Sequence, residues 1–379
     1  MEAKVEGENL IIFFDSRVDT NNAAKVEKEI KNFIEKNPNK ILNFDAENLE
    51  YISSVGLRIL LKFRKIFKKN LVIGNVSKEV AEVFETSGFT NFFDVQKKLR
   101  RISAENLRKI GRGTSGSVYK LDDENILKVY NDDWTFEKVK IERENSRKAF
   151  LSGLDTAIAY DVVKVEKNFG IVYEMLNADT LEKVISENPE QTEFYAKKFA
   201  DFLKSQNEIE FDGISGKQTR IELSKRIKNL DDETHEIIFE ILEQVPECKN
   251  FSHGDLNLSN IIVQDENFIM IDMGEISCGH SIFDVSWIYY MYEIRQRYGK
   301  NVPGPKVMPE IFWKSFSQQF FNTKDEKVLK HFEAEIFPYS AINLLIATLT
   351  RAFINPKVFD YYSKVLKEIK KDRIIPIDF

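Results

Sequence analysis

The chain has 379 residues, enough for two or three domains, and its 42% hydrophobic and 31% charged residues are typical of a soluble globular protein. No apolar run reaches the roughly 18–20 residues that span a bilayer, and the N-terminus lacks the basic and apolar segments of a signal peptide, so we expect a cytoplasmic protein without membrane contact. The net charge of −6 argues against nucleic-acid binding, and the two cysteines, Cys248 and Cys278, exclude a disulfide scaffold and lack zinc-site spacing.

Residues 1–98 alternate short apolar segments with amphipathic ones. Strands are expected at 10–14, 41–45 and 71–73. Helices are expected from the capping residues 19–22 to about Pro38, from Val55 to Lys69, and around Val80 up to Gly88. Strands that alternate with helices pair in parallel through right-handed crossovers, which predicts a small α/β domain. With 16 basic and 15 acidic residues, this part of the chain is close to neutral.

Three short motifs in this half carry a family resemblance. They are VDTNNA at 18–23, LEYISSVGLR at 49–58 and FETSGF at 84–89. Residues 5–95 thereby resemble a STAS domain, the fold of anti-sigma factor antagonists. The resemblance implies a regulatory domain with a protein partner. It also places the serine that is phosphorylated in that family at Ser54, with Ser53 in place of the usual acidic neighbour.

Two interpretations of Ser54 stay open. A phosphate at a helix N-terminus gains from the helix dipole and the free N–H groups, while it adds about two negative charges to a docking surface. The alternative is that Ser53 or Ser54 only caps the helix. Ser54 is therefore a candidate phosphorylation site rather than an assigned one.

Residues 99–379 show a different order of expected strands and helices. Short strands dominate from Gly111 to about Glu174, and helices dominate from about Gln191 onward, which predicts an α+β unit with an N-lobe at 99–176 and a C-lobe at 177–379. The join near 97–101 is charged and lacks Pro and Gly, so it is either a linker or a continuous helix. This half holds 39 basic and 46 acidic residues and hence essentially all the negative charge.

A glycine-rich segment opens the strand-rich part. Gly111, Gly113, Gly116 and Val118 fit the pattern G-x-G-x-x-G-x-V, which also marks dinucleotide-binding folds. Here a strand-like segment follows instead of a helix. The pattern therefore favours a hairpin that covers phosphates over a dinucleotide site, with a plain glycine hairpin as the alternative.

A lysine follows in the next expected strand. Lys128 has apolar neighbours, and such a charge is costly to bury unless it meets an anion. A lysine of this kind can hold the α- and β-phosphates of a nucleotide if a glutamate orients it. We favour Glu144 on the following helix for that role, with Glu142 second. The alternative is an edge-strand lysine that points to solvent.

The most specific segment runs from His253 to Asp272. It fits H-x-D-x-x-x-x-N, then an apolar strand, then D-x-G. Asp255 can accept the proton of an attacking hydroxyl, and Asn260 and Asp272 offer the oxygen ligands that Mg²⁺ requires. We expect His253 to orient the loop rather than to perform chemistry.

Residues 107 to about 370 accordingly resemble the protein-kinase-like superfamily, in its aminoglycoside/choline phosphotransferase branch. That branch is favoured over protein kinases because the loop reads HGD, Asn257 replaces the usual lysine, and no Ala-Pro-Glu follows. The resemblance implies ATP (with GTP not excluded), Mg²⁺ and a hydroxylated small-molecule acceptor. It also implies that Asp284 supports the catalytic loop and that backbone groups of Glu174 and Leu176 read the adenine edge.

In this family a helical insertion helps to build the acceptor site, and residues 222–244 fit that place. Their acidic residues could attract a cationic acceptor, although such a run is also typical of a solvated helix face. The acids are Asp231, Asp232, Glu233, Glu240 and Glu243.

Three functions remain open. The first is an ATP- and Mg²⁺-dependent phosphotransferase acting on a small molecule, regulated or localised by the STAS-like domain. The second is a Ser/Thr protein kinase that acts on Ser54 in cis or in trans, which the fusion favours and the missing lysine after Asp255 disfavours. The third is a partner-switching regulator that binds nucleotide without catalysis, which the complete motif set opposes. The candidate residues are Asp255 for catalysis, Gly111, Gly113, Gly116, Val118, Lys128, Glu144, Glu174 and Leu176 for the nucleotide, and Asn260 and Asp272 for the metal.

Overall fold

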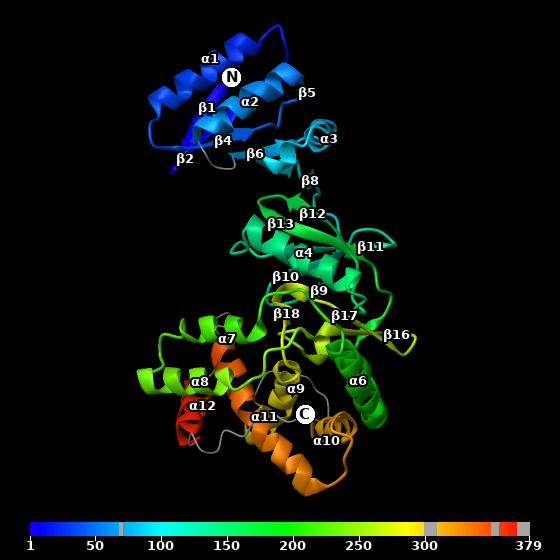
Figure 1. Ribbon diagram of the computed structural model, residues 1–379. Helices are drawn as coiled ribbons and strands as arrows, with labels where there is room; N and C mark the ends of the chain where they lie inside the picture. The colour runs from blue at the N-terminus through cyan, green and yellow to red at the C-terminus, as the bar shows by residue number, and fades with distance from the viewer. Residues whose placement is uncertain (68–70, 299–308, 350–355, 370–379) are drawn as a thin grey trace. The chain divides into compact units, whose positions relative to one another are not determined.

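The computed structural model describes residues 1–67, 71–298, 309–349 and 356–369, which form two compact units that divide between Arg101 and Ile102 (Figure 1). The division lies close to the expected boundary at residue 98. The join is extended rather than helical, with β7 (Phe93–Lys97) followed by β8 (Arg100–Arg101). No helix in the described ranges is long and apolar enough to cross a membrane.

The first unit is built on a five-stranded sheet with the order β1-β2-β4-β6-β7. Its strands are β1 (Glu2–Glu6), β2 (Asn9–Phe13), β4 (Ile41–Asp45), β6 (Leu71–Val76) and β7. The β1–β2 pair is antiparallel and the other pairs are parallel, which confirms the α/β prediction. The sequence did not predict β1 and β7 because both are edge strands with at most one buried residue each, so they carry no clear apolar period.

The three predicted helices of this unit are α1 (Ala23–Lys36), α2 (Ser54–Phe67) and α3 (Lys78–Thr86). The predicted end of the second helix, at Lys69, lies outside the described residues. Helices α1 and α2 lie side by side (Figure 1). The start of α2 packs tightly on the short parallel pair β3 (Arg17–Val18) and β5 (Tyr51–Ile52), because a Cβ at Gly56 would lie 2.9 Å from the Val18 carbonyl oxygen.

The second unit begins with a strand-rich N-lobe. Strands β12 (Ala159–Val165), β13 (Asn168–Glu174), β11 (Asn125–Tyr130), β10 (Gly116–Lys120) and β9 (Arg108–Arg112) follow one another across an antiparallel sheet. Helix α4 (Phe136–Leu151) contacts β12 and β13. Its buried residues Val139, Glu142, Ser146 and Ala149 recur at helical spacing, so one face of α4 is turned inward.

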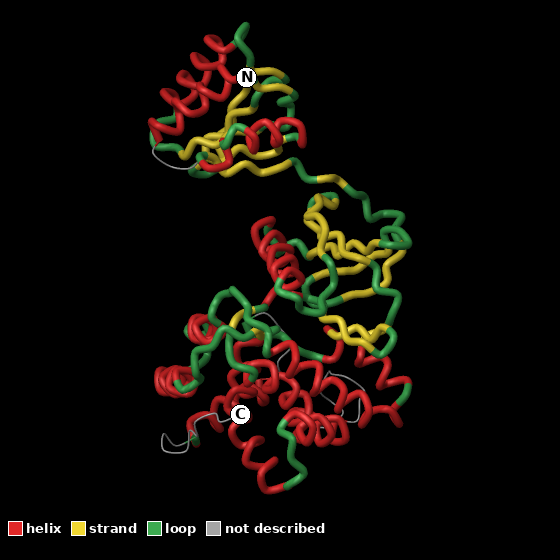
Figure 2. The backbone as a smooth tube through the Cα atoms, turned by 45° about the vertical axis from the view of Figure 1, so that its right-hand side comes forward, coloured by secondary structure: helices red, strands yellow, loops and turns green. Residues whose placement is uncertain are grey.

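The C-lobe that follows is mostly helical, as predicted (Figure 2). Its helices are α5 (Leu181–Glu187), α6 (Thr192–Asn207), α7 (Gly216–Ser224), α8 (Asp232–Glu243), α9 (Ile282–Tyr298), α10 (Pro309–Phe320), α11 (Glu326–Ala347) and α12 (Pro356–Glu368). Short strands carry the loops of the predicted motifs: β14 (Asp179–Thr180), β15 (Phe251–Ser252), β16 (Ile261–Gln264), β17 (Asn267–Met270) and β18 (Ser277–Cys278). The loop after β15 contains Asp255 and the loop after β17 contains Asp272.

Candidate functional site

The glycine-rich segment forms the predicted hairpin between β9 and β10. The Gly113 N–H donates to the Gly116 carbonyl at 2.9 Å. A Cβ at Gly116 would lie 2.1 Å from the Val129 carbonyl oxygen, so only glycine fits the neighbouring strand there. A Cβ at Gly113 would meet nothing within 4 Å, which leaves room for a ligand at the hairpin tip.

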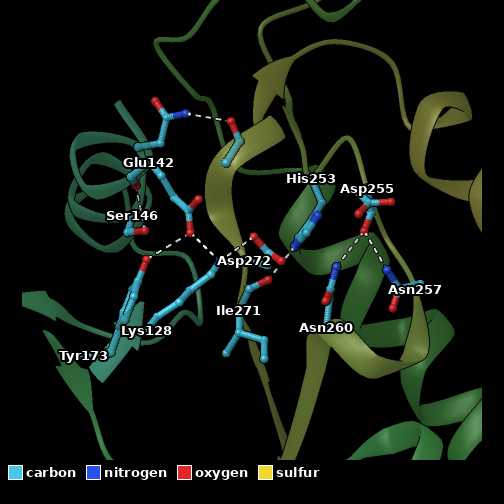
Figure 3. A network of polar contacts seen from close by, with 12 residues as sticks. Lys128, Glu142, Ser146, Tyr173, His253, Asp255, Asn257, Asn260, Ile271 and Asp272 are labelled. Atoms are coloured by element: carbon cyan, nitrogen blue, oxygen red, sulfur yellow. Dashed lines mark hydrogen bonds and ion pairs between the residues drawn. The ribbon is translucent and has the colours of Figure 1, made fainter. Parts of the chain in front are cut away.

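Lys128 lies between two carboxylates. Its Nζ is 2.7 Å from Glu142 Oε1 on α4 and 3.0 Å from Asp272 Oδ1 (Figure 3). Burial by itself lowers the pKa of Lys128, but the Glu142 and Asp272 charges outweigh burial and raise that pKa above its ordinary value. The lysine is therefore a fixed positive charge rather than a solvent-facing edge residue.

The glutamate favoured from sequence is wrong: Lys128 pairs with Glu142 and not with Glu144. Glu142 is 1% exposed on the inward face of α4, whereas Glu144 lies two positions around the helix, where its carboxylate pairs with Arg143 at 2.6 Å. A helical wheel would have found this, because Glu142 shares the spacing of the buried residues Val139 and Ser146.

Tyr173 is a partner of this ion pair that the sequence did not reveal. Its hydroxyl donates to Glu142 Oε1 at 3.2 Å from the end of β13. Burial, followed by the Glu142 charge, raises the pKa of Tyr173, so the hydroxyl keeps its proton and its role as donor. Lys128 and Tyr173 therefore both fix the same carboxylate oxygen.

Asp284 holds the loop before Asp255 in place. This fully buried carboxylate accepts the backbone N–H groups of His253 and Gly254, both at 3.0 Å. It also accepts Ser252 Oγ and Asn207 Nδ2, both at 3.1 Å. These contacts agree with the supporting role that the resemblance implied for Asp284.

Gly254 brings the Asp255 loop against the segment after Asp272. Its φ is +82°, and a Cβ there would lie 2.2 Å from the Glu275 carbonyl oxygen, so both conformation and space require glycine. On the other side, Trp287 Nε1 donates to the Gly254 carbonyl at 2.6 Å.

Contacts to its neighbours also fix the loop that carries Asp255 (Figure 3). Asn260 Nδ2 donates to the Asp255 carbonyl at 2.9 Å, so the Asn260 Oδ1 points away from that carbonyl. His253 Nε2 donates to the Ile271 carbonyl at 3.0 Å, which ties the loop to the residue before Asp272. His253 is thus an orienting residue here, as expected.

A cavity of about 390 Å³ lies between the two lobes of the second unit. Its lining includes nearly all the residues predicted for nucleotide and metal: Gly111, Gly113, Gly116, Val118, Lys128, Glu174, Leu176, Asn260 and Asp272. At residues 174–176, the hinge that follows β13 between the two lobes, the Met175 N–H donates to the Glu124 carbonyl, and Glu174 Oε1 accepts the Ile158 N–H at 2.7 Å. The Glu174 side chain therefore braces the hinge, a role that sequence analysis did not assign.

A second, smaller cavity of about 140 Å³ contains Asp255. Arg220 and Leu223 of α7, Glu275, and Asn343 of α11 are among its lining residues. Among the described residues that line it, none belongs to the acidic set predicted to attract a cation. Asp231 of that set instead caps α8, where it accepts the Thr234 N–H at 2.9 Å, and it pairs with Lys367.

In the first unit, Ser53 and Ser54 differ in their roles. Ser53 Oγ accepts the Gly56 N–H at 3.4 Å, so Ser53 makes the capping contact of α2. Ser54 is the first residue of α2 and is exposed.

Comparisons with known proteins place both units in families. The STAS domain profile matches residues 1–102, and the profile of the phosphotransferase enzyme family matches residues 106–302. Among solved structures, the ADP-bound aminoglycoside phosphotransferase APH(2'')-Ib is 18% identical, with 78% of this chain and 99% of that chain covered and a TM-score of 0.45. A choline/ethanolamine kinase family protein from Mesorhizobium loti is 11% identical, with 69% and 87% covered and a TM-score of 0.47. No curated protein matches the chain.

Proposed function

This chain belongs to the phosphotransferase enzyme family, and we propose that its second unit transfers the γ-phosphoryl group of ATP to a hydroxyl of a small molecule with the help of Mg²⁺. We propose further that its STAS domain regulates the transfer or binds a protein partner. Catalysis by such enzymes is mainly positioning and charge stabilisation, so the placement of the charged side chains is what matters most.

One observation carries the proposal. Two short segments each line both cavities: one supplies Asn260 to the larger and Asp255 to the smaller, and the other supplies Asp272 to the larger and Glu275 to the smaller. A nucleotide in the larger cavity and an acceptor in the smaller one would meet at these two segments. That is the arrangement that transfer between two bound molecules requires.

The residues of the larger cavity fit a nucleoside triphosphate. Lys128 is held by Glu142 where it can neutralise phosphate oxygens, and the glycine hairpin leaves open space at Gly113. The strand end at Glu174 and Leu176 lies in the same cavity, where backbone groups can read a purine edge. ATP is the expected nucleotide, and GTP is the alternative that the hinge contacts leave open.

The donor set also fits Mg²⁺. Asp272 offers a 38% exposed carboxylate, and the hydrogen bond from Asn260 Nδ2 leaves the Asn260 Oδ1 available. In the described ranges no cluster of three or more His, Cys, Asp or Glu side chains could hold an ion by itself, which suits a metal that takes few protein ligands and completes its shell with phosphates and water. When bound, Mg²⁺ would neutralise charge on the phosphates.

Asp255 is the proposed general base. As the acceptor oxygen forms its bond to the γ-phosphorus, the bond from that phosphorus to ADP breaks and the hydroxyl proton passes to the Asp255 carboxylate. Asp284 contributes by holding the backbone of the loop, and Lys128 contributes a fixed charge. Neither residue exchanges a proton in this scheme.

The test is ADP release by purified full-length protein with ATP, Mg²⁺ and a panel of hydroxylated metabolites. We expect Asp255→Ala to lower turnover by about a thousandfold, because the variant loses the group that accepts the hydroxyl proton. Asp265→Asn, a change of an exposed carboxylate at a loop position, is the matched control and keeps full activity. Equal turnover in Asp255→Ala and the wild type would contradict the assignment.

A second candidate function concerns Ser54. Because Ser53 makes the capping contact, the exposed Ser54 hydroxyl is not needed for the helix start and is open to modification. Phosphorylation by the second unit of the same or another copy would then control the STAS domain. The helix N-terminus would stabilise the phosphate.

Intact mass after incubation with ATP and Mg²⁺ tests this second function. We expect one added phosphate in the wild type and in Ser53→Ala, and none in Ser54→Ala. A Ser54→Ala protein that gains the same phosphate would exclude it. Tight ATP binding without transfer to Ser54 or to any acceptor would favour a regulator without catalysis.

A further inference from the structure

The smaller cavity contains an unusual cation. Arg220 lies on α7, 6% exposed, and lines the cavity together with Asp255. A buried guanidinium is costly unless it is paired or strongly hydrogen-bonded. The charge of Arg220 therefore needs a compensating partner.

The contacts of Arg220 are all neutral. Its Nη1 donates to the Gly216 carbonyl at 3.2 Å, its Nε donates to Asn343 Oδ1 at 3.3 Å, and its guanidinium lies 4.1 Å from the centre of the Phe283 ring. Within the described ranges Arg220 forms no ion pair, and the Asp284 and Glu275 carboxylates act on it only at longer range. Burial lowers the pKa of Arg220 to about 10, and those two carboxylates do not restore it.

The position of the guanidinium is nevertheless fixed. Ser286 Oγ donates to the Phe283 carbonyl at 3.1 Å, so it is left to accept Asn343 Nδ2 at 2.8 Å. That contact turns Asn343 Oδ1 toward Arg220. A chain of hydrogen bonds across α9 and α11 therefore aims the amide at the guanidinium, as in a preorganised binding site.

Lys217, three residues earlier on α7, is also a buried cation, but it has a carboxylate partner. It is 7% exposed, and its Nζ lies 2.8 Å from a carboxylate oxygen of Glu247 and 3.1 Å from the Val245 carbonyl. Lys217 thus has the carboxylate that Arg220 lacks. Asp284 and Glu275 act on Arg220 without a direct ion pair, and the Asp284 oxygens already accept four hydrogen bonds.

We propose that the acceptor carries an oxyanion, a carboxylate or a phosphate group, which binds Arg220 while its hydroxyl faces Asp255. Arginine suits this role because its planar donors match the oxygens of both groups. A cavity of about 140 Å³ with Leu223 and Trp287 in its lining suits a small acceptor with a short carbon chain. The inference rests on the proposed function and names the substrate class for its acceptor site.

The first test is calorimetric titration of the full-length protein, saturated with Mg²⁺ and a non-hydrolysable ATP analogue. The probes are glycerate, glycerol 3-phosphate, glycerol and ethanolamine, so that the carboxylate and phosphate arms are each compared with neutral and cationic alcohols. We expect one of the two anions to bind at least about tenfold more tightly than glycerol or ethanolamine. If neither anion does, the proposal is overturned.

Variants then locate the charge. Arg220→Met should weaken binding of the preferred anion by about 10- to 100-fold and leave the affinity for the ATP analogue unchanged. Lys217→Met, the matched control on the same helix, should keep the anion affinity within about threefold. Arg220→Lys keeps the charge without the planar donors, should lose part of the affinity, and serves if the Met variant does not fold. Anion affinity retained in a folded Arg220 variant overturns the proposal.

ADP release separates the two proposals. Anion binding that depends on Arg220, without any ADP release that depends on Asp255, would refute the proposed function and with it the acceptor role of the anion, and would leave only an anion-binding site at Arg220. ADP release with ethanolamine but with neither acid would refute the inference and leave the proposed function standing.

Discussion

The two units of this chain differ in whether they bury polar side chains. Among the described residues, every buried polar or charged side chain belongs to the second unit, and the core of the STAS domain is entirely apolar. Burying charge costs stability unless partners compensate it, so a chain that does so repeatedly must gain something other than stability. In the second unit some of the buried polar groups line the two cavities, such as Ser146 in the larger and Arg220 in the smaller.

Of the changes that test this comparison, the largest effect is expected at Asp284, a buried carboxylate that accepts four hydrogen bonds. Asp284→Asn keeps the size but replaces one acceptor oxygen with a donor, so some of its four N–H and O–H partners lose their acceptor. We expect a loss of about 3 kcal/mol or more in the free energy of unfolding and at least about a hundredfold in kcat. Chemical denaturation and steady-state kinetics measure both. A variant with wild-type values would break the comparison, because an interior charge would then be dispensable.

The next effect separates two glutamates of one helix. Glu142→Gln should reduce kcat/KM by about 10- to 100-fold, since it removes the charge that holds Lys128. Glu144→Gln, two positions away and half exposed, should stay within about twofold. Kinetics of the two purified variants decide between them. Equal losses would restore Glu144 to the role that sequence favoured.

A smaller effect belongs to Tyr173. Tyr173→Phe removes one donor to Glu142 and should cost about 1 kcal/mol of stability. In the Glu142→Gln background the same change should cost less, because the charged acceptor is already gone. A double-mutant cycle in denaturant measures this coupling. An equal cost in both backgrounds would show that Tyr173 does not act through Glu142.

The smallest effects lie on the surface of the STAS domain. Ser53→Ala should cost about 1 kcal/mol through loss of the capping contact, while Ser54→Ala should change stability by less than about 0.5 kcal/mol. Hydrogen exchange at the start of α2 in the full-length protein distinguishes the two. If Ser54→Ala were the costlier change, Ser54 would be the structural cap, and its case as a phosphorylation site would weaken.

The sequence predicted those parts of the site that depend on order along the chain. Lys128, Asp255, Asn260 and Asp272 could be proposed from sequence because their spacing is tied to strands and loops of a known pattern, and each of them lines one of the two cavities. The choice between Glu142 and Glu144 failed because both fit the spacing, and only the inward face of α4 separates them.

Other features could not be predicted in this way. The edge strands β1 and β7 carry too few buried residues to show a period. Arg220 belongs to no sequence motif. It stands out only because, within the described ranges, the structure gives this buried guanidinium no carboxylate partner. The contacts of Arg220 can be identified only in the folded protein, where α7, α9 and α11 meet.

Gly254 sets a limit on how this site can change over time. Some residues that line the smaller cavity, such as Leu223 on α7, lie on helices and can be exchanged one at a time. Position 254 has no such freedom, because any side chain would collide with the Glu275 backbone and would displace both segments that serve the two cavities. The lining of the smaller cavity can therefore change by single mutations, whereas the contact between the Asp255 loop and the Glu275 segment cannot.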